Sequence, residues 1–124
     1  MADTAISVTT LTMNAVSADT IVTAEGGTSV AAGDTAVIDV ANATDRVIIS
    51  LYGSGAATAT VQAGDSPLAV RSGLGATAAL TVPASDLLLL CLEGARFMHD
   101  DGKIRINIAT NAVVVGAHRL PKTI

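Results

Sequence analysis

The residues best suited to chemistry lie together near the C-terminal end of the sequence. His99, Asp100 and Asp101 place an imidazole beside two carboxylates, and His118 follows further along the chain. Such a group can bind a metal ion or transfer protons. However, two aspartates followed by Gly102 are also the composition of a tight turn, and metal sites usually take three or four ligands from rigid elements. We therefore predict a turn here, and neither a metal ion nor a cofactor.

Two other patterns associated with chemistry are incomplete. Gly53-Ser54-Gly55 follows an apolar stretch, as at the start of a dinucleotide-binding motif, but the helix that such a motif needs is missing. Residues 58–63 alternate polar and apolar like a strand, so residues 53–57 are interpreted as a hairpin. No Gly-x-Ser-x-Gly motif occurs, and no serine is placed by the sequence beside either histidine. We expect that the protein is not an enzyme.

The element that follows the two aspartates is predicted to be a β-strand. Across residues 103–108, isoleucine alternates with charged or polar residues, which is typical of a strand with one buried face. That face would carry Ile104, Ile106 and Ile108. Turn-forming residues precede the strand at 100–102 and follow it at 109–111, so we expect hairpins on both sides and antiparallel neighbours.

Comparable patterns predict further strands along the chain. They cover residues 29–31, 35–40, 46–52, 58–63, 77–82 and 112–118, with 46–52 in a central position. The apolar run 87–92 fits a strand or a short helix capped by Ser85, and we favour the strand because Gly94 follows too soon for a helix of ordinary length.

Many short strands separated by frequent turns indicate an all-β fold. The pattern fits an antiparallel β-sandwich, or a jelly-roll or barrel-like single domain. Residues 1–22 are predicted to form an extended N-terminal arm or edge strand, and residues 23–124 the β domain.

The composition indicates a core of small side chains. Half of the 124 residues are hydrophobic, but Tyr52 and Phe97 are the only aromatic residues. Alanine, valine, leucine and isoleucine remove less apolar area from water than aromatic side chains, each of which buries roughly 150 to 250 Å². We therefore expect a modestly stable protomer, and a homo-oligomer in which subunit contacts complete the burial.

The charge pattern limits the kinds of partner. A formal net charge of −4 argues against nucleic acid, whose phosphates need a basic face. Nine acidic and two basic residues precede Arg96, whereas five basic and two acidic residues lie from Arg96 onward. This asymmetry fits head-to-tail association or docking on an acidic protein surface, and it fits equally well a set of solvated strand faces.

Cysteine usage and hydropathy address the compartment. Cys91 is the only cysteine, so no intrachain disulfide forms, and its place in an apolar run predicts a small buried residue. No basic segment leads into an apolar stretch at the N-terminus, so no secretory signal is predicted. The apolar run 87–92 is far shorter than the about 20 residues of a membrane helix. We expect a soluble protein made in the cytoplasm, without a membrane partner.

Two arginines are the basic residues best suited to an interface. Arg71 lies between Val70 and Ser72, and Arg96 precedes Phe97. Arginine and aromatic side chains are enriched in binding hot spots, because they combine several hydrogen bonds or a large contact area in one residue. The alternative is that both arginines are solvated or paired locally.

Two stretches resemble a known family. They are AGDSPLAVRSGLG at 63–75 and LEGARF at 92–97, the second followed by an Asp-Gly turn and the strand at 103–108. Together they resemble small β-rich virion proteins of tailed bacteriophages, in particular capsid decoration (cement) proteins, with a likeness that covers roughly residues 45–120. The resemblance implies a virion protein on the capsid exterior that binds the major capsid protein, commonly as a trimer at three-fold positions, and reinforces the shell against internal DNA pressure.

The N-terminal arm departs from the family's pattern. Because extended segments can add a strand to a neighbouring subunit, we expect residues 1–11, with Ile6, Val8 and Leu11, to pair with a neighbouring chain. Arg71, Arg96 and Phe97 are expected at or near subunit contacts.

Two alternatives remain open. One is a carbohydrate-binding or adhesive β-sandwich of a phage tail or fibre, for which the chain offers few aromatic residues. The other is a tail-tube or head-completion protein.

Overall fold

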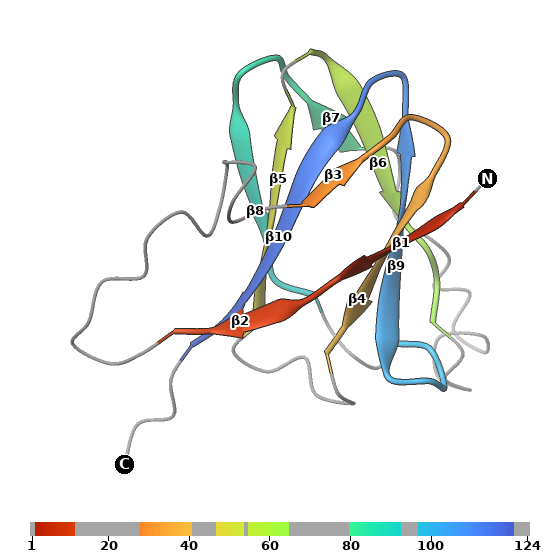
Figure 1. The fold of residues 1–124 in the computed structure, drawn as a ribbon, viewed down its shortest axis with the longest axis vertical. Coiled ribbons are helices and arrows are strands. Elements are labelled where there is room, and N and C mark those ends of the chain that lie inside the picture. The colour runs from red at the N-terminus through yellow and green to blue at the C-terminus, as the bar shows by residue number, and fades with distance from the viewer. Residues whose placement is uncertain are drawn as a thin grey trace.

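The computed structural model describes residues 2–11, 28–40, 47–53, 55–64, 80–92 and 97–120. These residues form ten β-strands in two sheets (Figure 1). The first sheet contains, in spatial order, β1 (Asp3–Ile6), β4 (Thr35–Asp39), β9 (Lys103–Ala109), β6 (Ala57–Val61) and β7 (Leu80–Val82). The second contains β2 (Val8–Thr10), β10 (Val113–Arg119), β5 (Val47–Gly53) and β8 (Leu87–Leu90). β3 (Thr28–Val30) pairs with the first residues of β10, and β2 pairs with its last residues.

The predicted all-β sandwich is confirmed, although its sheets are mixed and not purely antiparallel. β1 runs parallel to β4, and β2 runs parallel to β10, whereas all other strand pairs of the described residues are antiparallel. β1 and β2 belong to one continuous segment that runs in one direction, so β4 and β10 of the two sheets also run in that direction. The strands of the two layers are therefore aligned, as in an ordinary sandwich.

Alternation along the strands builds the core. Ile104, Ile106 and Ile108 of β9 are buried as predicted, and β9 lies between two antiparallel neighbours, β4 and β6. From the second sheet, Ile49 and Leu51 of β5 are also fully buried. The core is therefore filled by β-branched and aliphatic side chains of both layers.

The two predictions for the leucine-rich and central segments are also confirmed. The run 87–92 forms a strand, β8, and β5 lies between β10 and β8 in the interior of its sheet. The prediction for Cys91 is wrong, because this residue is exposed. It follows the last paired residue of an outermost strand, where no second layer covers it.

Two predicted hairpins are wrong. The connections at 53–57 and 109–111 both cross from one sheet to the other, β5 to β6 and β9 to β10. Each first strand already has a neighbour on both edges, so the strand that follows has to join the opposite layer. Asn111 Nδ2 donates a 2.6 Å hydrogen bond to the Ala56 carbonyl, which ties the two crossings together. A side chain at Gly55 would come within 3.1 Å of that same nitrogen, so the contact favours glycine there.

Asn107 links three strands of the first sheet. Its Oδ1 accepts hydrogen bonds from Thr35 Oγ1 at 2.9 Å and from Gln62 Nε2 at 2.8 Å. Thr35 lies on β4, Asn107 on β9, and Gln62 directly after β6. Thr35 is only 2% exposed, so its hydroxyl depends on a protein acceptor in place of water.

We predict that Asn107→Ala destabilises the fold by about 1–3 kcal/mol, because it removes the acceptor of a buried hydroxyl. Asn107→Asp is the matched control, since a carboxylate still accepts both bonds and should retain most of the stability. Urea denaturation followed by circular dichroism measures the free energy of unfolding. Equal loss in the two variants would show that the acceptor is not the reason.

Candidate interaction surface

The N-terminal segment crosses from one sheet to the other. β1 pairs with β4 from Asp3↔Thr35 to Ile6↔Ile38, and after Ser7 the chain continues as β2 along β10. Figure 1 shows this red segment running over one side of the molecule. Backbone bonds hold both ends: the Thr35 amide donates to the Ala2 carbonyl, and the Leu11 amide donates to the Arg119 carbonyl, each at 2.9 Å.

The arm residues predicted to bind a neighbouring chain lie against their own chain. Ile6 is 3% exposed and belongs to the core, and Val8 packs against the same core. Leu11 is half-buried at the end of the segment. In the single chain these residues therefore close one side of the sandwich, and their pairing with a neighbour stays a prediction.

The other predicted contact residues are placed differently. Phe97 is 5% exposed and lies in the core, so a surface contact through this side chain is not supported. The chain on either side of it is held close to Gly64, where a Cβ atom would meet the backbone of Phe97 and Met98. Arg71 and Arg96 lie outside the described residues.

An open cleft of about 500 Å³ lies beside the point where the arm changes sheets. Residues of both arm strands line it, with Ser7 between them, and three charged residues contribute from β4, β9 and β10: Asp39, Lys103 and Arg119. Asp39 and Lys103 are opposite each other in the β4–β9 pairing, and Arg119 Nη2 donates a 2.8 Å bond to the Val40 carbonyl. We call this feature the arm cleft. Its charged residues are far apart in the sequence, and the alternation of each strand is the only signal that could have placed them on its surface.

The group that could have been catalytic is a turn. The His99 amide donates to the Lys103 carbonyl and the Gly102 amide to the His99 carbonyl, both at 2.9 Å, and Gly102 has a φ of 76° that favours glycine. His118 lies on β10 of the other sheet. Within the described residues no group of three or more His, Cys, Asp or Glu side chains could hold a metal ion. The turn prediction is therefore confirmed.

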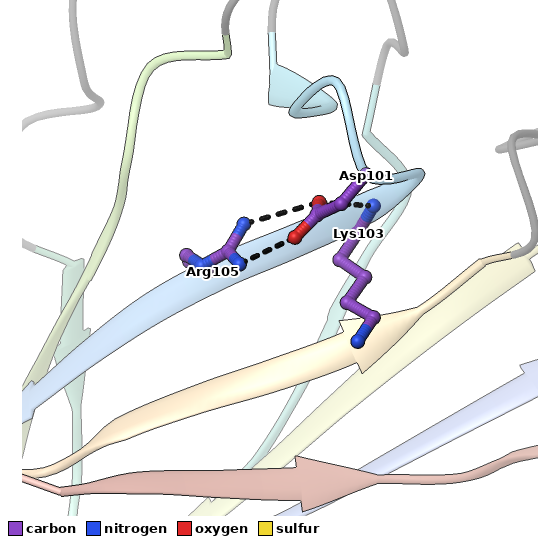
Figure 2. A network of polar contacts seen from close by, with 3 residues as sticks. All are labelled: Asp101, Lys103 and Arg105. Carbon is purple, nitrogen blue, oxygen red and sulfur yellow. Dashed lines mark hydrogen bonds and ion pairs between the residues drawn. The ribbon is translucent and has the colours of Figure 1, made fainter.

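Asp101 supports this turn through charge. Its carboxylate accepts two bonds from the Arg105 guanidinium, at 3.3 and 2.6 Å, and one from the Lys103 amide at 3.2 Å (Figure 2). The hydrogen bond from Arg105 is the largest reason why the pKa of Asp101 lies below its ordinary value of 3.8. Both side chains are partly or largely solvent-exposed, so this ion pair holds the turn and contributes little to overall stability.

We predict that Arg105→Gln raises the pKa of Asp101 toward its ordinary value. A lowered pKa in the folded state stabilises the fold above the unfolded-state pKa, and this contribution is lost as the pH falls through the folded-state pKa. The acid side of the stability profile should therefore depend less on Asp101 in the variant. An NMR titration of the Asp101 carboxyl measures the shift, and identical pKa values in the two proteins would contradict the assignment.

In the described part of the chain, no helix is long and apolar enough to cross a membrane. Comparisons with protein-family models, with curated proteins and with solved structures give no match. The function therefore has to be argued from the arm, the sheets and their surfaces.

Proposed function

We propose that this chain is a structural protein of a tailed-phage virion, which binds the outer surface of the capsid and stabilises the shell. Its partner would be the major capsid protein, and its form on the shell a homo-oligomer, with a trimer at three-fold positions favoured by the resemblance. The observation that carries the proposal is the arm, whose strands β1 and β2 each extend the edge of a sheet by backbone hydrogen bonds. Strand addition of this kind also joins separate chains.

The arm suits a reinforcing role because its bonds can be made by a second chain without loss. β1 contributes four paired residues and β2 three, each strand along one edge only. If two neighbours exchange arms, the same hydrogen bonds and the same burial of Ile6 form again between chains, so the exchange is nearly neutral in contacts. The result would be a mechanical link between protomers on a surface.

The aromatic residues disfavour a carbohydrate-binding function. Sugar rings are commonly stacked on aromatic faces, and the chain has one tyrosine, one phenylalanine and no tryptophan. Phe97 is in the core, so Tyr52, which is half-buried on β5, is the aromatic residue left for a surface.

We predict that the purified protein binds expanded capsids of the encoding phage. Binding should saturate at a fixed number of copies per capsid, and decorated shells should survive higher temperatures than bare shells because a ligand of the assembled state stabilises it. Cosedimentation followed by quantitative gel analysis measures the stoichiometry. Absence of cosedimentation, with expanded shells confirmed by electron microscopy, would overturn the proposed function.

A reversible lock tests the arm. Ala5 and Val37 are opposite each other in the β1–β4 pairing, so Ala5→Cys with Val37→Cys can tie the arm to its own chain, in a Cys91→Ser background that removes the native thiol. We predict that the oxidised variant loses most of its capsid occupancy and regains it on reduction, because a tied arm cannot exchange. The reduced form of the same sample is the control, and unchanged occupancy on oxidation would contradict the role of the arm.

A further inference from the structure

The outward faces of the two sheets differ in chemistry. The first sheet presents polar side chains around Asn107, including Thr58, Thr60 and Gln62. The pairing of β5 with β8 and β10 places a different set outward on the second sheet, which contains Ile48, Tyr52, Leu87, Leu89 and Val114. Exposure on this second face rises sharply toward β8: Ser50 of β5 is fully buried, whereas its partner Leu89 on β8 is 59% exposed.

β8 is an outermost strand of the described sheets, and it lacks the features that usually protect such edges. A strand edge presents unpaired N–H and C=O groups, which natural proteins shield with charges, prolines or very short strands. β1 carries Asp3, and β7 has three residues followed by Pro83. β8 is four consecutive leucines, with 41% of Leu87 exposed in addition to Leu89.

We propose that β8 pairs with the β8 strand of a second copy of this chain, antiparallel and about a two-fold axis. The second sheets of two protomers would then continue into each other. This inference goes beyond the proposed function, because it concerns association in solution. It uses the edge of the second sheet opposite to that of β2, so it is compatible with arm exchange.

Several properties of the edge favour a second copy as its occupant. β8 has leucines on both faces, so its partner has to be an uncharged strand that is apolar on both faces. The other outermost strands described here contain aspartate or threonine, and β8 itself meets the requirement. A chain with a net charge of −4 repels its copies in general, but β8 carries no charge that would oppose their approach. A two-fold pair also covers both edges with one contact.

The alternation of side chains limits the register. Leu87 and Leu89 face outward, and Leu88 and Leu90 face the inside of the sandwich, so residues that are directly opposite across the axis must have the same orientation. This requires Leu88 or Leu89 to lie on the axis. In both registers Asp86 lies away from its copy, so the acidic residue next to the strand does not oppose pairing.

The first test is sedimentation analysis of the full chain over a range of concentrations, which should show a reversible monomer–dimer equilibrium. The double variant Leu87→Lys with Leu89→Lys should raise the dimer dissociation constant at least about tenfold, because it removes leucine burial and places like charges opposite each other. Thr81→Lys, on the exposed edge strand β7 of the other sheet, is the matched control and should leave the equilibrium unchanged. Circular dichroism and urea denaturation confirm folding of each variant.

Charge reversal distinguishes specific pairing from general apolar association. Leu87→Glu with Leu89→Glu should also be monomeric, and an equimolar mixture with the lysine variant should restore dimers in either register. A chain that stays monomeric at all concentrations, a dimer that the lysines do not weaken, or a mixture without rescue would each overturn the proposal. None of these results bears on capsid binding, which is measured separately.

Cysteine pairing identifies the register. In a Cys91→Ser background, Leu89→Cys or Leu88→Cys should form an intermolecular disulfide on mild oxidation, depending on which residue lies on the axis, since directly opposite Cβ atoms are about 4.5–5.5 Å apart. Thr81→Cys in the same background should not. Cross-linking of Thr81→Cys as readily as of both leucine positions would show non-specific contact and overturn the two-fold pair.

Discussion

The requirement that strand edges be covered organises this molecule. Each edge presents backbone groups that need hydrogen-bond partners, and a two-layer sandwich has two such edges on each side. On one side a single segment serves both layers, because β1 completes the first sheet and β2 reaches the last residues of β10 in the second. On the other side β7 and β8 follow each other with only the 83–86 turn between them, and that turn is held by the Ser85 amide, which donates to the Gly53 carbonyl at 2.7 Å.

The contrast between the two sides explains why the proposed contacts use edges. The arm is an added strand that a neighbour could replace, and β8 is an edge to which a strand can be added. Both interactions depend on main-chain geometry and apolar burial, so they require no particular cluster of reactive side chains. A protein with this arrangement gains function from what it joins, and its polar side chains serve mainly to shape turns and strand faces, as Asp101 and Asn107 do.

Local patterns predicted the strands well and their neighbours less well. The period-two alternation of 103–108 is a local property, so the sequence was sufficient to predict β9 and its buried isoleucines. Whether a turn returns to the same sheet depends on which distant strands already flank it, and β4 with β6 decided this for β9. Turn-forming residues at 53–57 and 109–111 marked the ends of strands correctly but carried no information about the layer that comes next.

The same limit applies to the candidate site. The arm cleft gathers Asp39, Lys103 and Arg119 from three strands and from both layers, and no local pattern connects these positions. Cys91 and Phe97 were interpreted from their immediate neighbours, yet the position of β8 at an edge exposes the first, and close contact with Gly64 holds the segment of the second against the core. Composition nevertheless indicated correctly that small aliphatic side chains would fill the core.

The pairing of β2 with β10 also determines when the fold can be completed. β2 is among the first strands to leave the ribosome and β10 is the last of the described strands, so the second half of the arm has no edge to join until nearly the whole chain has been made. Contacts between such distant segments form slowly. During this interval the arm of a new chain is extended and uncovered, and on a polysome it is surrounded by other copies at high local concentration. Whether an arm ends on its own chain or on a neighbour is therefore decided largely during synthesis, before any capsid is present.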